Sequence, residues 1–178
     1  MWETKDPQPV KLIVGILAAD ESALAVTRQS LTDGLGLIDM QSPAWQFTQT
    51  KYYQDQMGPS LLRQFITFDE LIDPGRLADI KHTTNQIEQQ LADSLKSDYP
   101  RPVNLDPGII EPSKLVLAST KNFSQRIYIG NRIYAELTLM YIKGIWHTFE
   151  YTYPDYKQQH YHDFFNKARN RLREQLKT

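Results

Sequence analysis

The chain has 178 residues, of which 40% are hydrophobic, a formal net charge of −1 and no cysteine. This length favours one domain with a core of its own, and the near-neutral charge excludes a general attraction to DNA or to anionic lipid. The lack of cysteine excludes disulfides and thiolate metal sites. Every apolar run is shorter than the roughly 20 residues that cross a bilayer, and the first residues lack a hydrophobic signal region. We therefore expect a cytoplasmic protein with no DNA or membrane partner.

The N-terminal third predicts a lead, a strand and a helix. Residues 1–10 are polar and contain prolines, so we expect a loosely ordered lead. Residues 12–19 form a continuous apolar run, which is typical of a strand buried on both faces. Asp20 is placed to cap a helix that continues to about Asp33, where Gly34 is the predicted stop.

The middle of the chain predicts two antiparallel strands and a long helix. Residues 45–53 and 61–68 read as strands, with a turn at 54–60 between them. Asp73 and Pro74 form a helix start, because aspartate caps the first N–H groups and proline fits the first helical position. The helix after them carries apolar residues at helical spacing, namely Leu77, Ile80, Ile87, Leu91 and Leu95.

The remaining elements complete a prediction of the fold class. Residues 103–110 suggest a short strand with a turn at Pro107-Gly108, residues 113–120 a short helix, and residues 160–176 a last helix. The first two-thirds then follow the β-α-β-β-α-β order of ferredoxin-like folds. We expect a single α+β domain over residues 1–178, with a largely antiparallel sheet that ends in a three-stranded meander. Two longer helices, a short helix and a C-terminal helix would pack on it.

The meander has the clearest strand pattern in the chain. From 133 to 142 the odd positions are aliphatic, whereas the even positions include Glu136. A one-residue slip would move every side chain to the other face, so burial selects a three-residue loop at 130–132, which puts Arg126 opposite Glu136. A two-residue turn at Lys143-Gly144 would place His147, Phe149 and Tyr151 beside Met140, Thr138 and Glu136.

The non-aliphatic face of this meander is the candidate site. We expect Glu136 or Asp106 to act as a base or to bind a hydroxyl group of a ligand. The predicted ligand-binding residues are Arg126, Lys121, Tyr134, Thr138 and Tyr151. The predicted function is binding of a small anionic ligand, such as a nucleotide or a phosphorylated metabolite, and no reaction or cofactor follows from these residues. The other interpretation of Arg126 and Glu136 is a structural ion pair.

Three further patterns have structural explanations beside functional ones. Basic residues of the last helix could meet RNA or a protein, which is the alternative function, or form a solvated face. The polar border of the long helix, at Lys81, Thr84, Asn85 and Glu88, could bind a ligand or satisfy the packed helix itself. No metal site is predicted, because His160 and His162 are two apart and point in different directions on a helix.

Four segments together resemble a known family. They are TKYYQDQMG (50–58), LIDPGRLADIKHTTNQIE (71–88), the stretch 101–141 with its NLDPG and YAELTL motifs, and TYPDYK (152–157). They resemble a bacterial family catalogued as a domain of unknown function (four-four-one-six), whose members are sometimes labelled GTP-binding. The resemblance implies a small single-domain bacterial protein with no established activity. The sequence lacks the G-x-x-x-x-G-K-[ST] loop that cradles phosphates, so we expect no tight magnesium-dependent GTP binding through such a loop.

Overall fold

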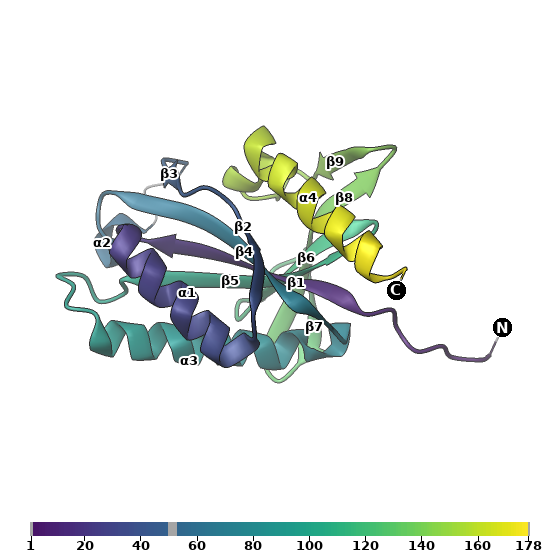
Figure 1. Cartoon of the computed structure of the whole chain (residues 1–178), viewed down its shortest axis with the longest axis horizontal. Helices are drawn as coiled ribbons and strands as arrows, with labels where there is room; N and C mark the ends of the chain where they lie inside the picture. The colour runs from purple at the N-terminus through teal and green to yellow at the C-terminus, as the bar shows by residue number, and fades with distance from the viewer. Residues whose placement is uncertain (1, 50–52, 178) are drawn as a thin grey trace.

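Nine strands form one antiparallel sheet in the computed structural model, which describes residues 2–49 and 53–177 (Figure 1). The strands are β1 (Val10–Ala18), β2 (Ile38–Gln41), β3 (Trp45–Phe47), β4 (Leu61–Ile72), β5 (Val103–Glu111), β6 (Lys114–Ser119), β7 (Arg126–Gly130), β8 (Ile133–Ile142) and β9 (Ile145–Thr148). Their order is β2-β4-β1-β5-β6-β8-β7, with β3 beside β4 and β9 beside β8. Residues 2–9 precede the sheet as an exposed segment without regular structure.

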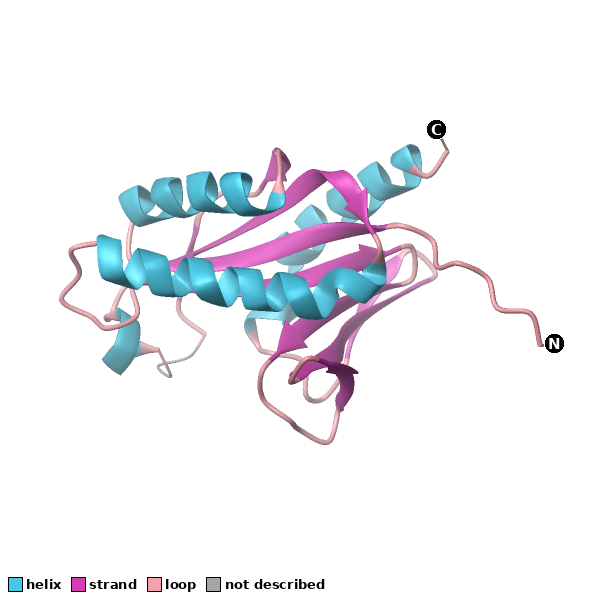
Figure 2. Cartoon of the chain, turned by 90° about the horizontal axis from the view of Figure 1, so that it is seen from below, coloured by secondary structure: helices cyan, strands magenta, loops and turns pink. Residues whose placement is uncertain are grey.

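Helices cover both faces of this sheet. The long helices α1 (Glu21–Leu35) and α3 (Leu77–Ser94) lie side by side on one face, as the view from below shows (Figure 2). The opposite face carries α4 (Gln159–Gln175). The short elements are α2 (Gln54–Met57) and the 3₁₀ helices η1 (Pro74–Arg76) and η2 (Asp155–Lys157). None of the described helices is long and apolar enough to cross a membrane.

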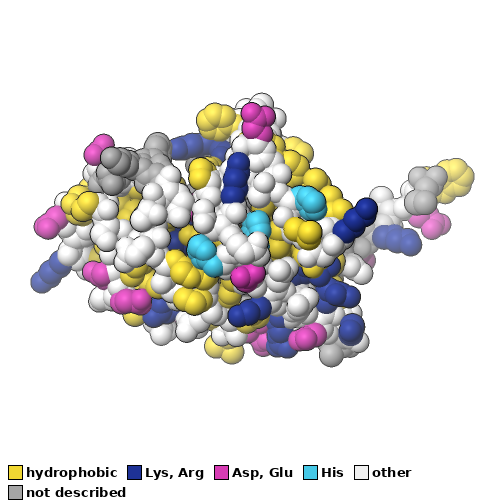
Figure 3. Space-filling view, turned by 90° about the horizontal axis from the view of Figure 1, so that it is seen from above, with side chains coloured by type: hydrophobic (Ala, Val, Ile, Leu, Met, Phe, Trp, Pro, Cys, Tyr) yellow, Lys and Arg dark blue, Asp and Glu magenta, His cyan; other side chains and the backbone are white. Residues whose placement is uncertain are grey.

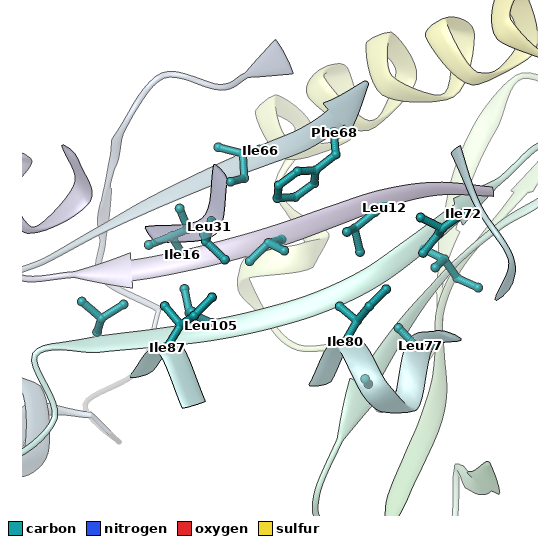
Figure 4. Packing of buried hydrophobic residues seen from close by; sticks show 14 of the residues in the cluster. Leu12, Ile16, Leu31, Ile66, Phe68, Ile72, Leu77, Ile80, Ile87 and Leu105 are labelled. Atoms are coloured by element: carbon teal, nitrogen blue, oxygen red, sulfur yellow. The ribbon is translucent and has the colours of Figure 1, made fainter. Parts of the chain in front are cut away.

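The predicted α+β class and the β-α-β-β-α-β arrangement of the first two-thirds are confirmed. Strand β1 is central between β4 and β5, and α1 and α3 pack on the same face of the sheet. All nine residues of β1 are buried, as its apolar run predicts. Alternate side chains such as Leu12 and Ile16 pack against α1 and α3 (Figure 4), whereas Ile13 packs toward α4.

Both predicted helix caps are confirmed, and one predicted stop is wrong. The Asp20 carboxylate accepts a hydrogen bond from the N–H of Ala23 at 2.8 Å, and that of Asp73 accepts one from Gly75 at 2.6 Å. Helix α1 passes Gly34 and ends before Gly36, whose φ of 105° suits glycine at a helix end. Gly34 instead faces α3, where an added Cβ would lie 3.1 Å from the Ile87 side chain.

The strands between these helices differ from the prediction. Strand β3 covers only the first three residues of the predicted 45–53 strand, and β2 was not predicted. Positions 50–52 lie outside the described residues. Part of the predicted turn at 54–60 is the single-turn helix α2. The sequence therefore predicted that the strands are interrupted here, but not that a helical turn forms the interruption.

Two predictions for residues 103–120 are wrong. Strand β5 continues through Pro107-Gly108 without a turn, and the predicted short helix is strand β6. Proline at position 112 fits a tight turn as well as a helix start, and here Glu111 pairs with Lys114 across a two-residue turn. Burial of Leu115 and Leu117 at alternate positions decides in favour of the strand.

The meander and the Arg126–Glu136 register are confirmed, but the loop geometry differs from the prediction. Arg126 pairs with Glu136, while the register shifts by one residue before Gly130. The turn consists of two residues, Asn131 and Arg132, both with positive φ, and Gly130 pairs with Ile133. The predicted three-residue loop is therefore a two-residue turn with a bulge at Ile129. The His147–Met140 pair is also confirmed.

The predicted pairing of Phe149 and Tyr151 with β8 is wrong. Strand β9 ends at Thr148, and a turn follows in which the N–H of Thr152 donates to the carbonyl of Phe149. The Thr152 hydroxyl donates to the Thr138 carbonyl at 2.8 Å, so a side chain replaces the expected strand ladder.

Candidate functional site

A cavity of about 190 Å³ lies where β5 and β6 separate. Its walls come from β3, β4, β5 and α3, from the end of β6 and the loop after it, from β7 and β8, and from η2 with the segment that leads into it. The charged side chains that line it are Arg63, Lys81, Arg101, Asp106, Lys121, Arg126, Glu136 and Asp155.

The NLDPG segment produces the separation of the two strands. Pairing of β5 with β6 extends only from Gly108–Leu117 to Glu111–Lys114. Gly108 allows the close approach there, because an added Cβ would lie 2.5 Å from the Val116 carbonyl oxygen. Before Gly108, Pro107 has no N–H to donate, and β6 has left β5. The side chains of Asn104 and Asp106 line the space that opens.

Side chains of α3 satisfy the β5 backbone where β6 is absent. The N–H of Leu105 donates to Glu88 Oε1 at 2.7 Å, and the carbonyl of Leu105 accepts from Lys81 Nζ at 2.8 Å. The Arg101 guanidinium donates to Glu88 at 2.8 Å and also bonds Asn104. Lys81 and Glu88, two residues of the polar border of α3, therefore satisfy the backbone of β5, which agrees with the structural explanation of this border. Lys81 also lines the cavity.

Arg63 is the most buried cation of the site. Its side chain is 3% exposed and donates to Asp106 and to Asp155, each at 3.0 Å. The rings of Phe47, Phe65 and Tyr156 surround its guanidinium at 5.4–5.9 Å.

Glycine at position 15 in β1 makes room for this guanidinium. An added Cβ at Gly15 would lie 3.0 Å from Arg63 Nη1 and 3.0 Å from the Phe65 ring. The only glycine of β1 thus lies where the Arg63 guanidinium needs space.

The two carboxylates on Arg63 have pKa values shifted in opposite directions. Burial raises the pKa of Asp106, but the charges of Arg63 and Lys81 outweigh burial and lower it below 3.8. Burial also raises the pKa of Asp155, and there the attraction of Arg63 is too weak to reverse the shift. One guanidinium therefore holds an easily ionised carboxylate and one that takes up a proton more readily.

These shifts predict opposite pH profiles for two isosteric variants. The lowered pKa of Asp106 gives stability that is present above its unfolded pKa of about 3.9 and lost in acid, so Asp106→Asn should destabilise most near pH 7. The raised pKa of Asp155 gives stability that is present below about 3.9 and lost as pH rises, so Asp155→Asn should destabilise most in acid. Urea unfolding of wild type and both variants between about pH 3 and pH 7 measures this. The same pH trend in both variants would contradict the assignment.

Arg126 and Glu136 form the second charged centre. The Arg126 Nε donates to Glu136 Oε2 at 2.8 Å, and the two side chains are only 4% and 2% exposed. The Arg126 Nη1 bonds the Ser119 hydroxyl and the Lys121 carbonyl, and its Nη2 bonds the Tyr153 hydroxyl at 2.6 Å. In the part of the chain that the structure describes, Glu136 Oε1 is buried and has no hydrogen-bond partner.

A model of the family described as Domain of unknown function (DUF4416) matches residues 8–172. The chain belongs to this family. All residues that line the cavity lie inside the matched range, so the site is part of the DUF4416 domain itself. No curated protein matches this DUF4416 chain.

The structure brings four of the predicted site residues together in the DUF4416 domain and places three elsewhere. Asp106, Lys121, Arg126 and Glu136 line the cavity. Thr138 is fully buried and bonds the Glu136 carbonyl, and Tyr151 donates to the Leu137 carbonyl. Tyr134 packs edge-on against Tyr128 on β7, with ring centroids 5.4 Å apart.

Sequence reasoning missed several residues of the cavity. Arg63 lies in a strand that was read only as a partner strand, and Arg101 and Asp155 lie beside prolines that were read only as breaks. A signal was present for Arg63, since it shares one face of its strand with Leu61 and Phe65 and is a charge among apolar neighbours. Asp155 had no such local signal.

The histidine pair has structural roles. His160 packs against the Trp45 ring, and His162 Nε2 lies 2.8 Å from the Tyr156 carbonyl oxygen. Within residues 2–49 and 53–177, no group of three or more histidine or acidic side chains is placed to hold a metal ion.

Proposed function

We propose that this DUF4416 protein binds a small anionic ligand, such as a phosphorylated metabolite or a nucleotide, in the cavity between the meander and Asp106. The main support for this proposal is the charge of the side chains that line the cavity. Five cationic and three carboxylate side chains from the described residues line it, which leaves an excess of two positive charges, or of one when Glu88, the partner of Arg101, is counted as well. The whole chain has a formal charge of −1, so positive charge is concentrated at this site.

Lys81 and Arg101 keep hydrogen-bond donors for a ligand, and Arg63 Nε is also without a partner among the described residues. Within the described residues, the Lys81 ammonium makes a single hydrogen bond, to the Leu105 carbonyl, although it has three N–H groups. Arg101 uses Nε and Nη2 for Glu88 and Asn104, which leaves Nη1 without a bond to the described residues. Lys81 is only 6% exposed, and in such a place a charge interacts with an anion more strongly than it would in water.

The basic residues of α4 give less support to the alternative of RNA or protein binding. Arg169 donates to the Pro112 carbonyl at 2.6 Å and lies 3.7 Å from the centre of the Tyr141 ring. Arg171 pairs with Asp39 and Asp69. Lysine and arginine side chains on this face are scattered among acidic and hydrophobic ones (Figure 3). Such a surface lacks the continuous basic patch that phosphate backbones require.

Thermal unfolding with and without anions tests the proposal. We expect orthophosphate, ribose 5-phosphate or AMP to raise the Tm of the wild type, because a ligand at 100 times its Kd stabilises by about 2.7 kcal/mol. Lys81→Met and Arg101→Met should each remove most of the rise. Arg173→Met, which changes an exposed arginine of α4, is the matched control and should keep it. No rise with any of the anions, or an undiminished rise in both cavity variants, would refute the proposal.

A further inference from the structure

We infer that the anion also carries a hydroxyl or amine group that donates a hydrogen bond to Oε1 of Glu136. This inference rests on the proposed function and narrows its ligand to a small anion with a separate donor group, such as a hydroxylated phosphate ester. The unpaired oxygen at the meander, together with the spare cationic donors of Lys81 in α3 and of Arg101 before β5, defines this class.

On the meander, the carboxylate oxygen Oε1 of Glu136 is a hydrogen-bond acceptor without a donor among the described residues. Glu136 is 2% exposed and lines the cavity. Its Oε2 accepts from Arg126 and from Gln125, whereas its Oε1 has no partner among the described residues. Folded proteins leave very few buried polar atoms unpaired, because each such atom has lost its bonds to water without replacement. A ligand with an O–H or N–H group would supply the missing donor.

The donors of Arg126 are largely committed to the protein, so Arg126 has few N–H groups left for a ligand, and Glu136 Oε1 is the open acceptor at this end of the cavity. Its guanidinium holds Glu136, the Ser119 hydroxyl, the Lys121 carbonyl and the Tyr153 hydroxyl. An anionic group placed beside Glu136 Oε1 would also meet a carboxylate oxygen. The anionic group therefore belongs with Lys81 and Arg101, which come from other elements of the fold.

The size of the cavity limits the ligand as well. Its volume is about 190 Å³. Sites for larger organic ligands enclose about 300–1,000 Å³. A compound of the size of a three-carbon phosphate ester matches this volume better than a dinucleotide.

Two phosphate esters that differ only in their hydroxyl groups test this inference by calorimetric titration. Glycerol 3-phosphate offers two hydroxyl donors, and n-propyl phosphate has the same chain length and phosphate but none. We expect the wild type to bind glycerol 3-phosphate about tenfold more tightly, as expected for one hydrogen bond to a charged acceptor.

The Glu136→Gln variant shows whether Glu136 is the acceptor. The amide oxygen of this glutamine must stay on Arg126 to accept its N–H, so the amide NH₂ takes the position of Oε1. A donor then replaces the acceptor, and a ligand hydroxyl can only accept from it in a neutral hydrogen bond, so the tenfold preference for glycerol 3-phosphate should become clearly smaller. An undiminished preference in a folded Glu136→Gln protein would overturn the assignment.

The wild-type measurement decides the inference even if the variant fails to fold. Equal affinity of the wild type for the two esters would overturn the inference while the proposed anion binding stands. Binding of neither ester, up to millimolar concentration, would count against the inference and the proposed function together. Binding of n-propyl phosphate that survives Lys81→Met and Arg101→Met unchanged would place the anion elsewhere and overturn both.

Discussion

Arg63→Met is expected to lower the free energy of unfolding by about 3–5 kcal/mol, since removal of one member of a buried ion pair has this cost. Asp106 and Asp155 would remain beside an apolar side chain, and Asp155, which is 6% exposed, pairs with no other cation among the residues that the structure describes. Urea unfolding at pH 7 measures the change. A loss of this size is a large fraction of the 5–15 kcal/mol that stabilises an ordinary domain.

Two further variants separate lost charge pairing from lost packing. Arg173→Met changes an exposed arginine to the same side chain and should alter stability by no more than about 0.5 kcal/mol. The triple variant Arg63→Met, Asp106→Asn, Asp155→Asn removes all three charges and should be more stable than Arg63→Met alone. A triple variant that is less stable than Arg63→Met would show that packing of the arginine stem, not its charge, holds the cluster.

Local patterns predicted the register of the meander, but not the face that is buried. Matching the isoleucines of β7 and β8 placed Arg126 opposite Glu136, as observed. The aliphatic face is not the buried one at β7, because Ile127 is 73% exposed whereas the side chains of Arg126 and Glu136 are 4% and 2% exposed. The same reasoning failed at β6, where Pro112 is compatible with a helix start and with a turn. Only the partners on both sides of β6, which the sequence does not display, distinguish the two.

In the candidate site as well, the sequence predicted contacts within one hairpin but not contacts between distant segments. Arg126 and Glu136 are ten residues apart and were predicted to be neighbours from one hairpin. Arg63 reaches Asp106 across 43 positions and Asp155 across 92, and no periodicity connects residues so far apart. The cavity depends on these long-range contacts. Sequence reasoning therefore found its meander side and missed the side built around Arg63.

A second buried cation ties α4 to the sheet away from the cavity. Lys11 in β1 is fully buried, and its ammonium donates to Asp39 at 2.6 Å, to the Phe68 carbonyl at 2.7 Å and to Gln175 at 2.9 Å. All three N–H groups of the ammonium are thus used. From α4, Arg171 also reaches Asp39, so β1, β2, β4 and α4 meet at one polar cluster. The position of α4 on the sheet matters to the site because η2, which carries Asp155, directly precedes this helix.

Lys11→Met is accordingly expected to destabilise the protein by about 3–5 kcal/mol, because Asp39, whose side chain is 10% exposed, loses its ammonium partner and keeps, among the described residues, only the 3.4 Å contact with Arg171 as an ion pair. Urea unfolding measures the loss, and hydrogen exchange should show faster exchange in the last turns of α4, where Gln175 loses its bond to Lys11. Lys167→Met, at an exposed position of α4, is the matched control and should change stability by no more than about 0.5 kcal/mol. The cavity keeps all its charged residues in Lys11→Met, so the rise in Tm with anions should persist in the folded variant. A loss of stability below about 1 kcal/mol would show that methionine packs as well as the bonded lysine, which is the outcome that replacement of a buried charge sometimes gives.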